Sequence, residues 1–298
     1  MYPLYETKGM FMNRLGETFR FIREGKGKSI TEVAKSHLST SQLSRFENAQ
    51  SEITVSKLIK VLEEMNVEFD EFIYASRDFK KDDLTRILEQ LKVAIYVRDI
   101  AKIRQLLSKE LSKVQSGTRV NYHRLNAILI KLKLRDLDET VNILETDLTY
   151  LTDYLFQIEN WSYYELLLFA NTIDGLKHSC MMLFCKEIIN RTQFYREMKR
   201  HRLAVSQILL SAYLICIERN EFVDAIFLEK TLQSLFFDET EIFERILFRY
   251  GKGFYSYQKK EDPNGILEMR KCIGLLRAVD SQNIADWYEK FLENILNK

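Results

Sequence analysis

Apolar residues recur at spacings of three and four along nearly the whole chain, which places them on one face of an α-helix. The pattern begins near Asn13, with Leu15, Phe19 and Ile22. Only 2 prolines and 10 glycines occur in 298 residues. A β-sandwich or barrel needs a turn with these residues about every 8 to 12 positions. The helical pattern and the scarcity of turn residues together predict an all-α protein.

Five short helices are expected in the N-terminal segment, residues 1–75. The first ends in the stretch Gly25-Lys26-Gly27, and the fifth lies near Phe69. Hydroxyl residues between them mark helix starts, because their oxygens accept hydrogen bonds from the first free helix amides. The expected start signals are Ser29 with Glu32 as a capping box, Ser39, and either Thr54 or Ser56.

The second and third of these helices have the pattern of a helix-turn-helix DNA reader, in which the second helix of the pair enters the major groove. Leu43 and Phe46 anchor the third helix inside, so its polar side chains face outward. Hydroxyl, amide and guanidinium groups can hydrogen-bond base edges, and arginine suits guanine. We expect base reading by Thr40, Ser41, Gln42 and Arg45, and phosphate contacts by Arg14, Lys28, Ser29 and Asn48.

Local charge supports this interpretation, whereas the net charge of +1 favours no class of partner. Residues 14–48 hold 7 Lys and Arg against 4 Glu, a balance of +3, and residues 49–75 hold 2 Lys against 6 acids, a balance of −4. The basic end carries the expected reading helix, as in DNA-binding domains. The alternative is a five-helix bundle with solvated charges.

The segments L-G-E-T-F-R-F-I-R-E-G-K-G-K-S-I-T-E-V-A and S-Q-L-S-R-F-E-N resemble the Xre/Cro-type helix-turn-helix family. That resemblance implies a partly buried structural ion pair between Arg23 of the first helix and Glu47 at the end of the reading helix. The turn departs from the family pattern: it is one residue shorter and has His37 where many relatives have glycine. We therefore interpret His37 as a turn residue.

Beyond residue 80 the helical pattern repeats about every 40 residues. Starts of helix pairs fall near Lys80, Arg119, Asn160, Arg200, Thr240 and Ser281. We expect a right-handed superhelix of about five tetratricopeptide-like hairpins, closed by the capping helix W-Y-E-K-F-L-E-N-I-L. The second helix of the second hairpin is expected to begin with T-V-N-I-L-E-T-D-L, residues 140–148.

Such superhelices bind extended peptides in a concave groove that the first helix of each pair lines. Polar groups stand among apolar ones on those helices, and an Asn side chain can both donate to and accept from a peptide backbone. The expected peptide-binding residues are Arg119, Tyr122, Asn126, Tyr164 and Asn171. Two alternatives stay open: Asn171 satisfies backbone near a helix end, and the aromatic residues pack the repeats, as expected for Trp161, Tyr163, Phe169, Phe248 and Tyr255.

Catalytic and metal chemistry are not indicated. No Walker loop, G-x-S-x-G, HExxH or paired Cys-x-x-Cys motif occurs, and no cofactor is expected. His178, Cys180 and Cys185 share a helix, but spacings of two and seven do not bring them together. No window approaches 18 uncharged apolar residues, so a cytoplasmic protein without a membrane partner is expected.

From end to end, the chain resembles the Rgg/GadR/MutR regulators of Gram-positive bacteria. The resemblance is carried by H-L-S-T-S-Q-L-S-R-F-E-N-A-Q-S-E-I and by W-S-Y-Y-E-L-L-L-F-A-N. It implies a homodimeric transcription factor that binds a double-stranded DNA operator and senses a short hydrophobic peptide pheromone, as in quorum sensing. RNA polymerase stays open as a further partner.

The expected division is a DNA-binding domain over residues 1–75, a linker over 76–80 and a peptide-binding and dimerisation domain over 81–298. The dimerisation surface is expected on the capping helix, with Trp287, Phe291 and Ile295. The alternative function is an adaptor whose groove binds a protein partner. An enzyme is the least favoured class, because no nucleophile and base occur at motif spacing.

Overall fold

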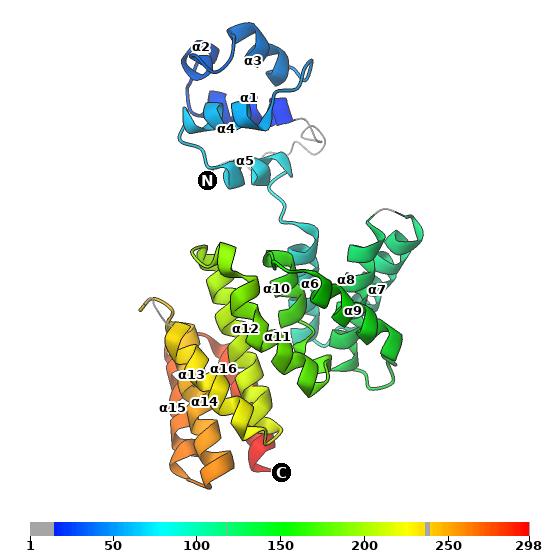
Figure 1. Ribbon diagram of the computed structural model, residues 1–298, viewed down its shortest axis with the longest axis vertical. Coiled ribbons are helices and arrows are strands. Elements are labelled where there is room, and N and C mark those ends of the chain that lie inside the picture. The colour runs from blue at the N-terminus through cyan, green and yellow to red at the C-terminus, as the bar shows by residue number, and fades with distance from the viewer. Residues whose placement is uncertain (1–14, 118, 236–238, 298) are drawn as a thin grey trace. The chain divides into compact units, whose positions relative to one another are not determined.

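The computed structural model describes residues 15–117, 119–235 and 239–297, and every regular element in these ranges is helical (Figure 1). The all-α prediction is therefore confirmed for the described part of the chain. Contacts divide the chain into two compact units, Met1–Gln90 and Leu91–Lys298. This division falls inside one helix, α6 (Asp83–Tyr96), whereas the expected linker at residues 76–80 remains a prediction.

The first unit contains the five expected short helices, and their start signals are those that the sequence indicated. Ser29 and Ser39 each form a capping box, with Glu32 and Gln42. Thr54 accepts a hydrogen bond from the backbone of Lys57, so it is Thr54 that opens the fourth helix. The helices are α1 (Leu15–Gly25), α2 (Ile30–Ala34), α3 (Thr40–Glu47), α4 (Val55–Glu63) and α5 (Phe69–Ser76).

A small aromatic and aliphatic core fixes α3 in the first unit. Phe19, Leu43 and Phe46 are almost completely buried, and the rings of Phe19 and Phe46 lie 5.9 Å apart. Gly16 allows α1 to approach α3 closely, because a Cβ atom at this position would lie 1.7 Å from the carbonyl oxygen of Phe46. The inner face of α3 is therefore held at backbone distance from α1.

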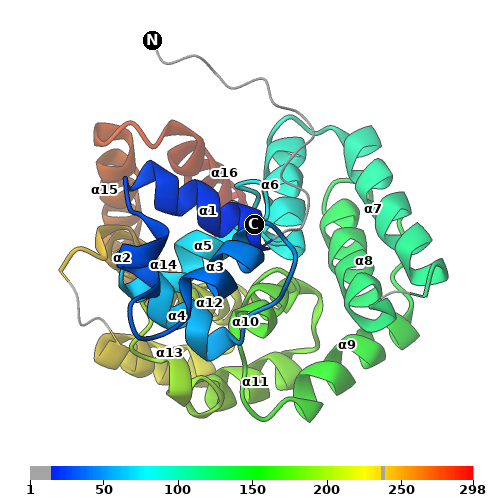
Figure 2. The same cartoon turned by 90° about the horizontal axis from the view of Figure 1, so that it is seen from above.

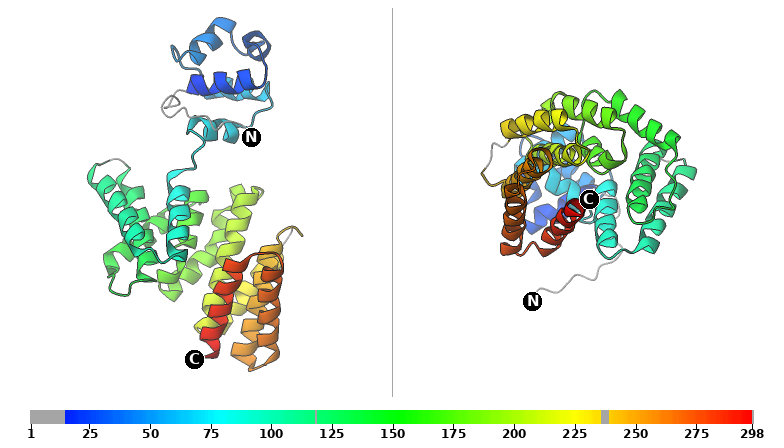
Figure 3. Two further views of the ribbon diagram at one scale, coloured as in Figure 1. Left: turned by 180° about the vertical axis from the view of Figure 1, so that it is seen from behind. Right: turned by 90° about the horizontal axis from the view of Figure 1, so that it is seen from below.

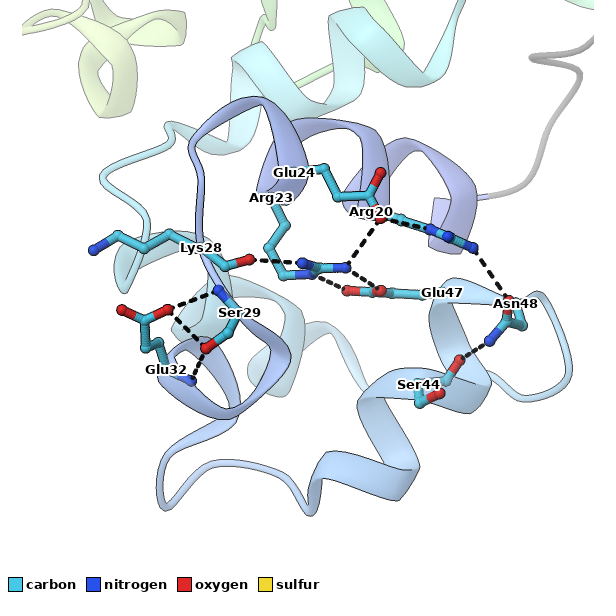
Figure 4. A network of polar contacts seen from close by, with 9 residues as sticks. All are labelled: Arg20, Arg23, Glu24, Lys28, Ser29, Glu32, Ser44, Glu47 and Asn48. Carbon is cyan, nitrogen blue, oxygen red and sulfur yellow. Dashed lines mark hydrogen bonds and ion pairs between the residues drawn. The ribbon is translucent and has the colours of Figure 1, made fainter.

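A buried ion pair adds a directional bond to this packing (Figure 4). The guanidinium of Arg23 donates from Nε and Nη2 to the two carboxylate oxygens of Glu47, at 2.6 and 2.8 Å. Its Nη1 donates to the backbone carbonyl of Lys28 at 2.6 Å. These are the two residues that the family resemblance pairs. One guanidinium thus joins α1, the segment before α2 and the end of α3.

The second unit consists of hairpins at the expected spacing, followed by one single helix. First and second helices alternate, and two short 3₁₀ helices, η1 (Ile173–Gly175) and η2 (Gln193–Tyr195), lie in the connections. The long helices are α6 (Asp83–Tyr96), α7 (Ile100–Gln115), α8 (Val120–Arg135), α9 (Glu145–Gln157), α10 (Tyr163–Ala170), α11 (His178–Arg191), α12 (Lys199–Glu218), α13 (Phe222–Leu235), α14 (Ile242–Lys260), α15 (Asn264–Ala278) and α16 (Gln282–Leu296).

The prediction for the start of α9 was wrong by five residues, since the helix begins at Glu145 rather than at Thr140. The carboxylate of Asp138 accepts hydrogen bonds from the amide and the hydroxyl of Thr140, at 3.1 and 2.5 Å. An Asp side chain that bonds the backbone two residues on forms a turn that competes with helix. This local turn delays the start of the helix.

Within the second unit the hairpins follow a curve (Figures 2 and 3). α8, α10, α12 and α14 lie on its inner side and α7, α9, α11, α13 and α15 on its outer side. Contacts also run directly between successive inner helices, from α8 to α10, from α10 to α12 and from α12 to α14. Trp161 and Phe169 are fully buried between the helices, as the repeat-packing alternative expected.

Helix ends in both units explain how so few glycines suffice. Several helices end with a residue in the left-handed conformation. The amide of the next residue then donates a hydrogen bond to the carbonyl five residues before it, which is the Schellman motif. Examples are Gln50 to Arg45 at 2.8 Å and Ser281 to Leu276 at 2.9 Å. Glycine is usual at the left-handed position, but here the positive φ angles fall on Ala49, Asn66, Asp78, Arg98, Asn220 and Asp280.

Two glycines are required where α14 and α15 pack against each other. A Cβ atom at Gly265 would lie 2.3 Å from the carbonyl oxygen of Gly253, and one at Gly253 would lie 2.8 Å from the carbonyl oxygen of Gly265. Backbone atoms cannot move aside as a flexible side chain can. The two helices therefore touch at a point that only glycine permits.

We predict that Gly265→Ala lowers stability by about 1 to 3 kcal/mol, because the added methyl group forces α14 and α15 apart. Gly274→Ala, on the exposed side of the same helix and with no atom within 4 Å of the added Cβ, is the matched control. It should raise stability by about 0.5 to 1 kcal/mol, since alanine favours helix over glycine. Urea unfolding followed by circular dichroism measures both, and equal shifts would contradict the close contact.

We further predict that Arg23→Ala destabilises the first unit by about 3 to 5 kcal/mol, because it leaves the buried Glu47 carboxylate without its cation. Arg20→Ala is the control: Arg20 is bonded to Glu24 on the exposed side of α1, where an ion pair contributes little. Pulse proteolysis in urea, scored by cleavage within residues 15–76, separates the two variants. Coincident midpoints would show that the pair does not hold the unit together.

Candidate functional site

The outward face of α3 presents the residues that the sequence selected for base reading. Thr40, Ser41 and Arg45 are exposed, whereas Gln42 is partly buried. The Arg45 guanidinium has no hydrogen bond or ion pair with any other described residue, so its donors are available. The inner residues Leu43, Phe46 and Glu47 are all buried. This rigid helix therefore carries one unpaired guanidinium flanked by hydroxyl and amide groups.

Two of the reading candidates also take part in the start of their own helix. The Gln42 side-chain oxygen accepts a long hydrogen bond of 3.4 Å from the Ser39 amide, and the Ser39 hydroxyl accepts one of 3.2 Å from the Gln42 amide. The hydroxyls of Ser39 and Ser41 lie 3.1 Å apart. Bidentate binding to adenine needs both ends of an amide, so Gln42 would have to leave the cap. Arg45 has no such competition.

The phosphate-contact candidates differ in what the fold leaves available. Lys28 is exposed, and its hydrogen bonds to Arg23 are made by its backbone amide and carbonyl rather than by its ammonium group. The Ser29 hydroxyl, in contrast, donates to Glu32 at 2.7 Å and accepts from the Glu32 amide at 3.2 Å. Arg14 lies outside the described residues. Among the described candidates, Lys28 alone combines a positive charge with a free end.

Asn48 lines an acidic depression, and Figure 4 shows its hydrogen bonds. Its amide nitrogen donates to the Ser44 carbonyl at 2.8 Å, and its oxygen accepts from Arg20 at 3.5 Å. The depression, of about 270 Å³, is lined by Glu17, Arg20, Phe21, Glu24, Glu47 and Asn48. Arg20 and Arg23 are already paired with Glu24 and Glu47, so the depression has no excess positive charge to attract a phosphate. These surroundings disfavour Asn48 as a phosphate contact.

The turn before α3 is tied to α4 through Glu64. Its carboxylate accepts from the ammonium of Lys35 and lies 3.1 Å from the Nε2 atom of His37. The hydrogen bond from Lys35, followed by that from His37, lowers the pKa of Glu64. His37 thus has a structural partner in the turn, in agreement with its interpretation as a turn residue.

The second candidate site, on α8 and α10, brings together three of the residues expected to bind a peptide. The rings of Tyr122 and Tyr164 meet edge to face with centroids 5.0 Å apart, and the Tyr164 hydroxyl donates to the Asn126 oxygen at 3.3 Å. Asn126, however, is buried, and its amide nitrogen donates to Glu110 at 3.2 Å. Both ends of the amide are therefore engaged inside the protein rather than free for a peptide backbone.

Sequence reasoning missed the acidic partners of this site. Glu110 on α7 is buried and also accepts from Lys113 at 2.7 Å and contacts Nδ1 of His123 at 2.8 Å. Lys113 lies three residues away on the same helix, but His123 and Asn126 lie 13 and 16 residues away, so no local pattern could reveal that Glu110 belongs to this site. Glu165 could have been found, because S-Y-Y-E is a capping box: Ser162 donates to it from its amide and its hydroxyl, at 2.9 and 2.6 Å.

The two remaining peptide candidates, Asn171 and Arg119, form no hydrogen bond with Tyr122, Asn126 or Tyr164 in the described part of the chain. Asn171 follows the last residue of α10 and donates to the Leu167 carbonyl at 2.8 Å, which is the backbone-satisfying role that the alternative expected. Its side-chain oxygen has no partner among the described residues. Arg119 is exposed and left-handed, with φ 48°, at the start of α8. Its side chain is free of contacts within the described ranges.

The dimerisation candidates on α16 do not share one face. Trp287 is 55% exposed and stacks on Phe291 with centroids 5.7 Å apart. Ile295 packs within its own chain at 8% exposure, which weighs against the expected dimer contact. Ala285, Tyr288, Leu292 and Ile295 form the inward stripe of the helix. Only the Trp287 side of α16 is open to a partner.

The structure gives no further site for chemistry within the described ranges. No group of three or more His, Cys, Asp or Glu there has an arrangement suited to a metal ion. The four cysteines are free thiols, and burial raises the pKa of Cys272 to about 11 and that of Cys216 to about 12. Every described helix is too short or too polar to cross a lipid bilayer.

Comparison with solved structures places both units in a known architecture. The SHP pheromone receptor Rgg2 from Streptococcus dysgalactiae is 28% identical, with 94% of this chain and 99% of that chain covered and a TM-score of 0.79. A Listeria monocytogenes EGD-e protein that is 22% identical, with 96% of this chain and 98% of that one covered and a TM-score of 0.80, shows the same fold. The complex of PrgX with cCF10, at 14% identity, coverages of 96% and 93% and a TM-score of 0.71, also shows the fold alone.

Family profiles match in the same order as the two units. A profile described as helix-turn-helix covers residues 19–72, which include the whole of α2, α3 and α4. The profile described as the C-terminal domain of the HTH-type transcriptional regulator Rgg covers residues 104–290, more than half of the chain. The chain therefore belongs to the Rgg family of helix-turn-helix transcriptional regulators.

Proposed function

We propose that this protein reads an operator with α3 and changes transcription when a short hydrophobic peptide occupies the inner side of its helical repeats. The observation that carries the DNA-binding half is Arg45, a guanidinium that is exposed, without a partner among the described residues, and fixed on a helix anchored by Arg23 and Glu47. Arginine binds the two acceptors of guanine in the major groove. Thr40, Ser41 and Gln42 would read neighbouring bases, while Lys28 would bind phosphate.

The peptide-binding half is supported by the inner helices and by a relative. Rgg2, which aligns over nearly the whole of both chains, is described as a pheromone receptor. On the inner helices of this protein, Arg119 and Tyr122 are exposed and Tyr164 is partly exposed. We assign peptide contact to these three residues and to the free oxygen of Asn171. Asn126 instead positions Tyr164 and binds Glu110 from within.

Regulation requires that the peptide favour one arrangement of the protein over another, because a ligand that binds two states equally shifts nothing. We propose a cytoplasmic homodimer that presents two reading helices to two half-sites of an operator. The Trp287 side of α16 is the proposed dimer contact, since the tryptophan is exposed and stacked on Phe291. The proposed DNA-binding domain comprises residues 1–75, with a linker at 76–80.

An adaptor that grips a protein partner in its groove is the second candidate. It would need no available donors on the outward face of α3, yet this face presents Arg45 and Ser41 rather than an apolar contact surface. Sequence-specific retention of DNA separates the two functions. Mapping the DNA that the protein occupies in its native host would supply the operator for the tests below.

Arg45→Ala should weaken sequence-specific binding while leaving the fold unchanged, because the side chain is exposed and makes no hydrogen bond or ion pair with another described residue. A lost bidentate guanine contact costs about 1 to 3 kcal/mol, or roughly 5- to 150-fold in affinity. Gel-shift titration with the mapped operator and with a scrambled duplex gives the ratio of the two affinities. An unchanged ratio would remove Arg45 from the reading surface.

Lys28→Ala is the matched comparison for Arg45→Ala. A phosphate contact carries no sequence information, so this variant should weaken binding to both duplexes equally. The slope of log affinity against log salt should become shallower by about 0.9, the contribution of one neutralised phosphate. A change in the operator-to-scrambled ratio for Lys28→Ala would mean that the two roles are wrongly divided.

Tyr122→Ala should weaken peptide binding at least fivefold, roughly 1 kcal/mol, and lower the melting temperature only slightly, because the ring is about half exposed. Asn126→Leu should lower the melting temperature instead, since it removes a partner from the buried Glu110. Fluorescence polarisation with a labelled octapeptide, selected from a random library against the full chain, measures binding. Equal effects of the two variants on binding and on melting would contradict the division.

A further inference from the structure

Three tyrosine rings from three helices meet at nearly right angles in the second unit. Tyr122 of α8 lies at 89° to Tyr164 of α10, and Tyr154 of α9 lies at 75° and 89° to these two. All three pairs are edge to face, with centroids 5.0 Å apart for Tyr122 and Tyr164 and 6.5 and 6.4 Å apart for Tyr154 and these two. All three rings are at least partly exposed. We call this set the tyrosine cluster.

The tyrosine cluster is held in place by hydrogen bonds from its hydroxyl groups. The Tyr154 hydroxyl donates to Glu165 at 2.6 Å, and the Tyr164 hydroxyl donates to Asn126 at 3.3 Å. Asn126 is fixed in turn by Glu110. Burial, followed by the bond to Glu165, raises the pKa of Tyr154, so its hydroxyl stays a donor. The rings are therefore preorganised, and their exposed parts are free of these bonds.

The two buried carboxylates next to the tyrosine cluster, those of Glu110 and Glu165, differ in their partners. Glu110 is buried and has Lys113 as a cationic partner at 2.7 Å. Glu165 is also buried, but it forms no ion pair with a basic residue in the described part of the chain. Its partners are the amide and hydroxyl of Ser162 and the hydroxyl of Tyr154, which are all neutral donors. One negative charge behind the rings thus has no cationic side chain opposite it.

Such a cluster of aromatic rings attracts an organic cation. The face of an aromatic ring carries negative potential, and a cation within about 6 Å of its centroid is attracted to it. The centroid separations of 5.0, 6.4 and 6.5 Å allow one cation to lie within about 6 Å of all three rings. The same region already uses a tyrosine face in this way: the Arg124 guanidinium lies 3.8 Å from the centroid of Tyr150.

We propose that the tyrosine cluster is a specificity subsite that binds the side chain of a lysine or arginine in the peptide ligand. The cation lies against the faces of Tyr154 and its neighbours, and Glu165 supplies the opposite charge through the Tyr154 hydroxyl. The remaining residues of the peptide extend along the inner helices. This inference rests on the proposed peptide binding, and it adds a cationic residue to a ligand that is otherwise apolar.

The test begins with a random octapeptide library selected against the full-length protein. The selected peptides should share a lysine or arginine at one position. For the best of them, a synthetic version with norleucine, which keeps the chain length of lysine but lacks its charge, should bind five- to tenfold more weakly. Isothermal titration calorimetry measures the lysine-to-norleucine ratio for the protein and for each variant.

Two variants remove the two parts of the subsite separately. Tyr154→Leu removes a ring face, and Glu165→Gln removes the charge while keeping a side chain that can complete the capping box. Both should reduce the lysine-to-norleucine ratio below about twofold. Tyr154→Phe retains the face and should retain at least half of the ratio, and Tyr255→Leu, on the distant helix α14, should leave it unchanged.

Each outcome decides between the subsite and the proposed function. Selected peptides without a shared cation, or a lysine-to-norleucine ratio that survives both Tyr154→Leu and Glu165→Gln, would overturn the subsite while leaving peptide binding intact. A library that yields no binder would overturn peptide binding, and the subsite with it. Circular dichroism of each variant, compared with the parent protein, ensures that a lost ratio is not a lost fold.

Discussion

The presentation of the reading helix depends on one buried guanidinium. Arg23 bridges α1, the Lys28 carbonyl and both oxygens of Glu47, so the end of α3 is fixed from behind. A buried ion pair gains little net stability over an apolar pair, since both charges lose their hydration. What it does provide is direction, because a planar guanidinium accepts few arrangements of its partners. The close approach at Gly16 depends on the same alignment.

Local signals in the sequence predicted the elements well. Capping residues and apolar spacing are encoded within one or two helical turns, and Ser29, Ser39 and Thr54 start helices as expected. The late start of α9 shows the limit of this reasoning, since apolar spacing continued through a segment that Asp138 holds in a turn. Periodicity reports which residues share a face, but a competing side-chain bond decides where the helix begins.

The sites were harder to predict, because their partners are distant in sequence. Asn126 was expected to face a peptide, and it lies inside because Glu110, on the preceding helix, needs its donor. Ile295 fits two stripes on α16, one with Trp287 and Phe291 and one with Tyr288 and Leu292, and only packing shows that the second stripe is inward. In each case the missing information was the face that a neighbouring helix covers.

The left-handed turns have a consequence for the connections between helices. A side chain at positive φ is held there by its surroundings at about 1 kcal/mol or more, least for Asn and Asp. Ala49, directly after the reading helix, and Arg98, within the first hairpin, are of this kind. Their geometry is imposed by the helices they join and not by glycine's own freedom. These junctions therefore hold backbone strain that glycine at the same positions would not.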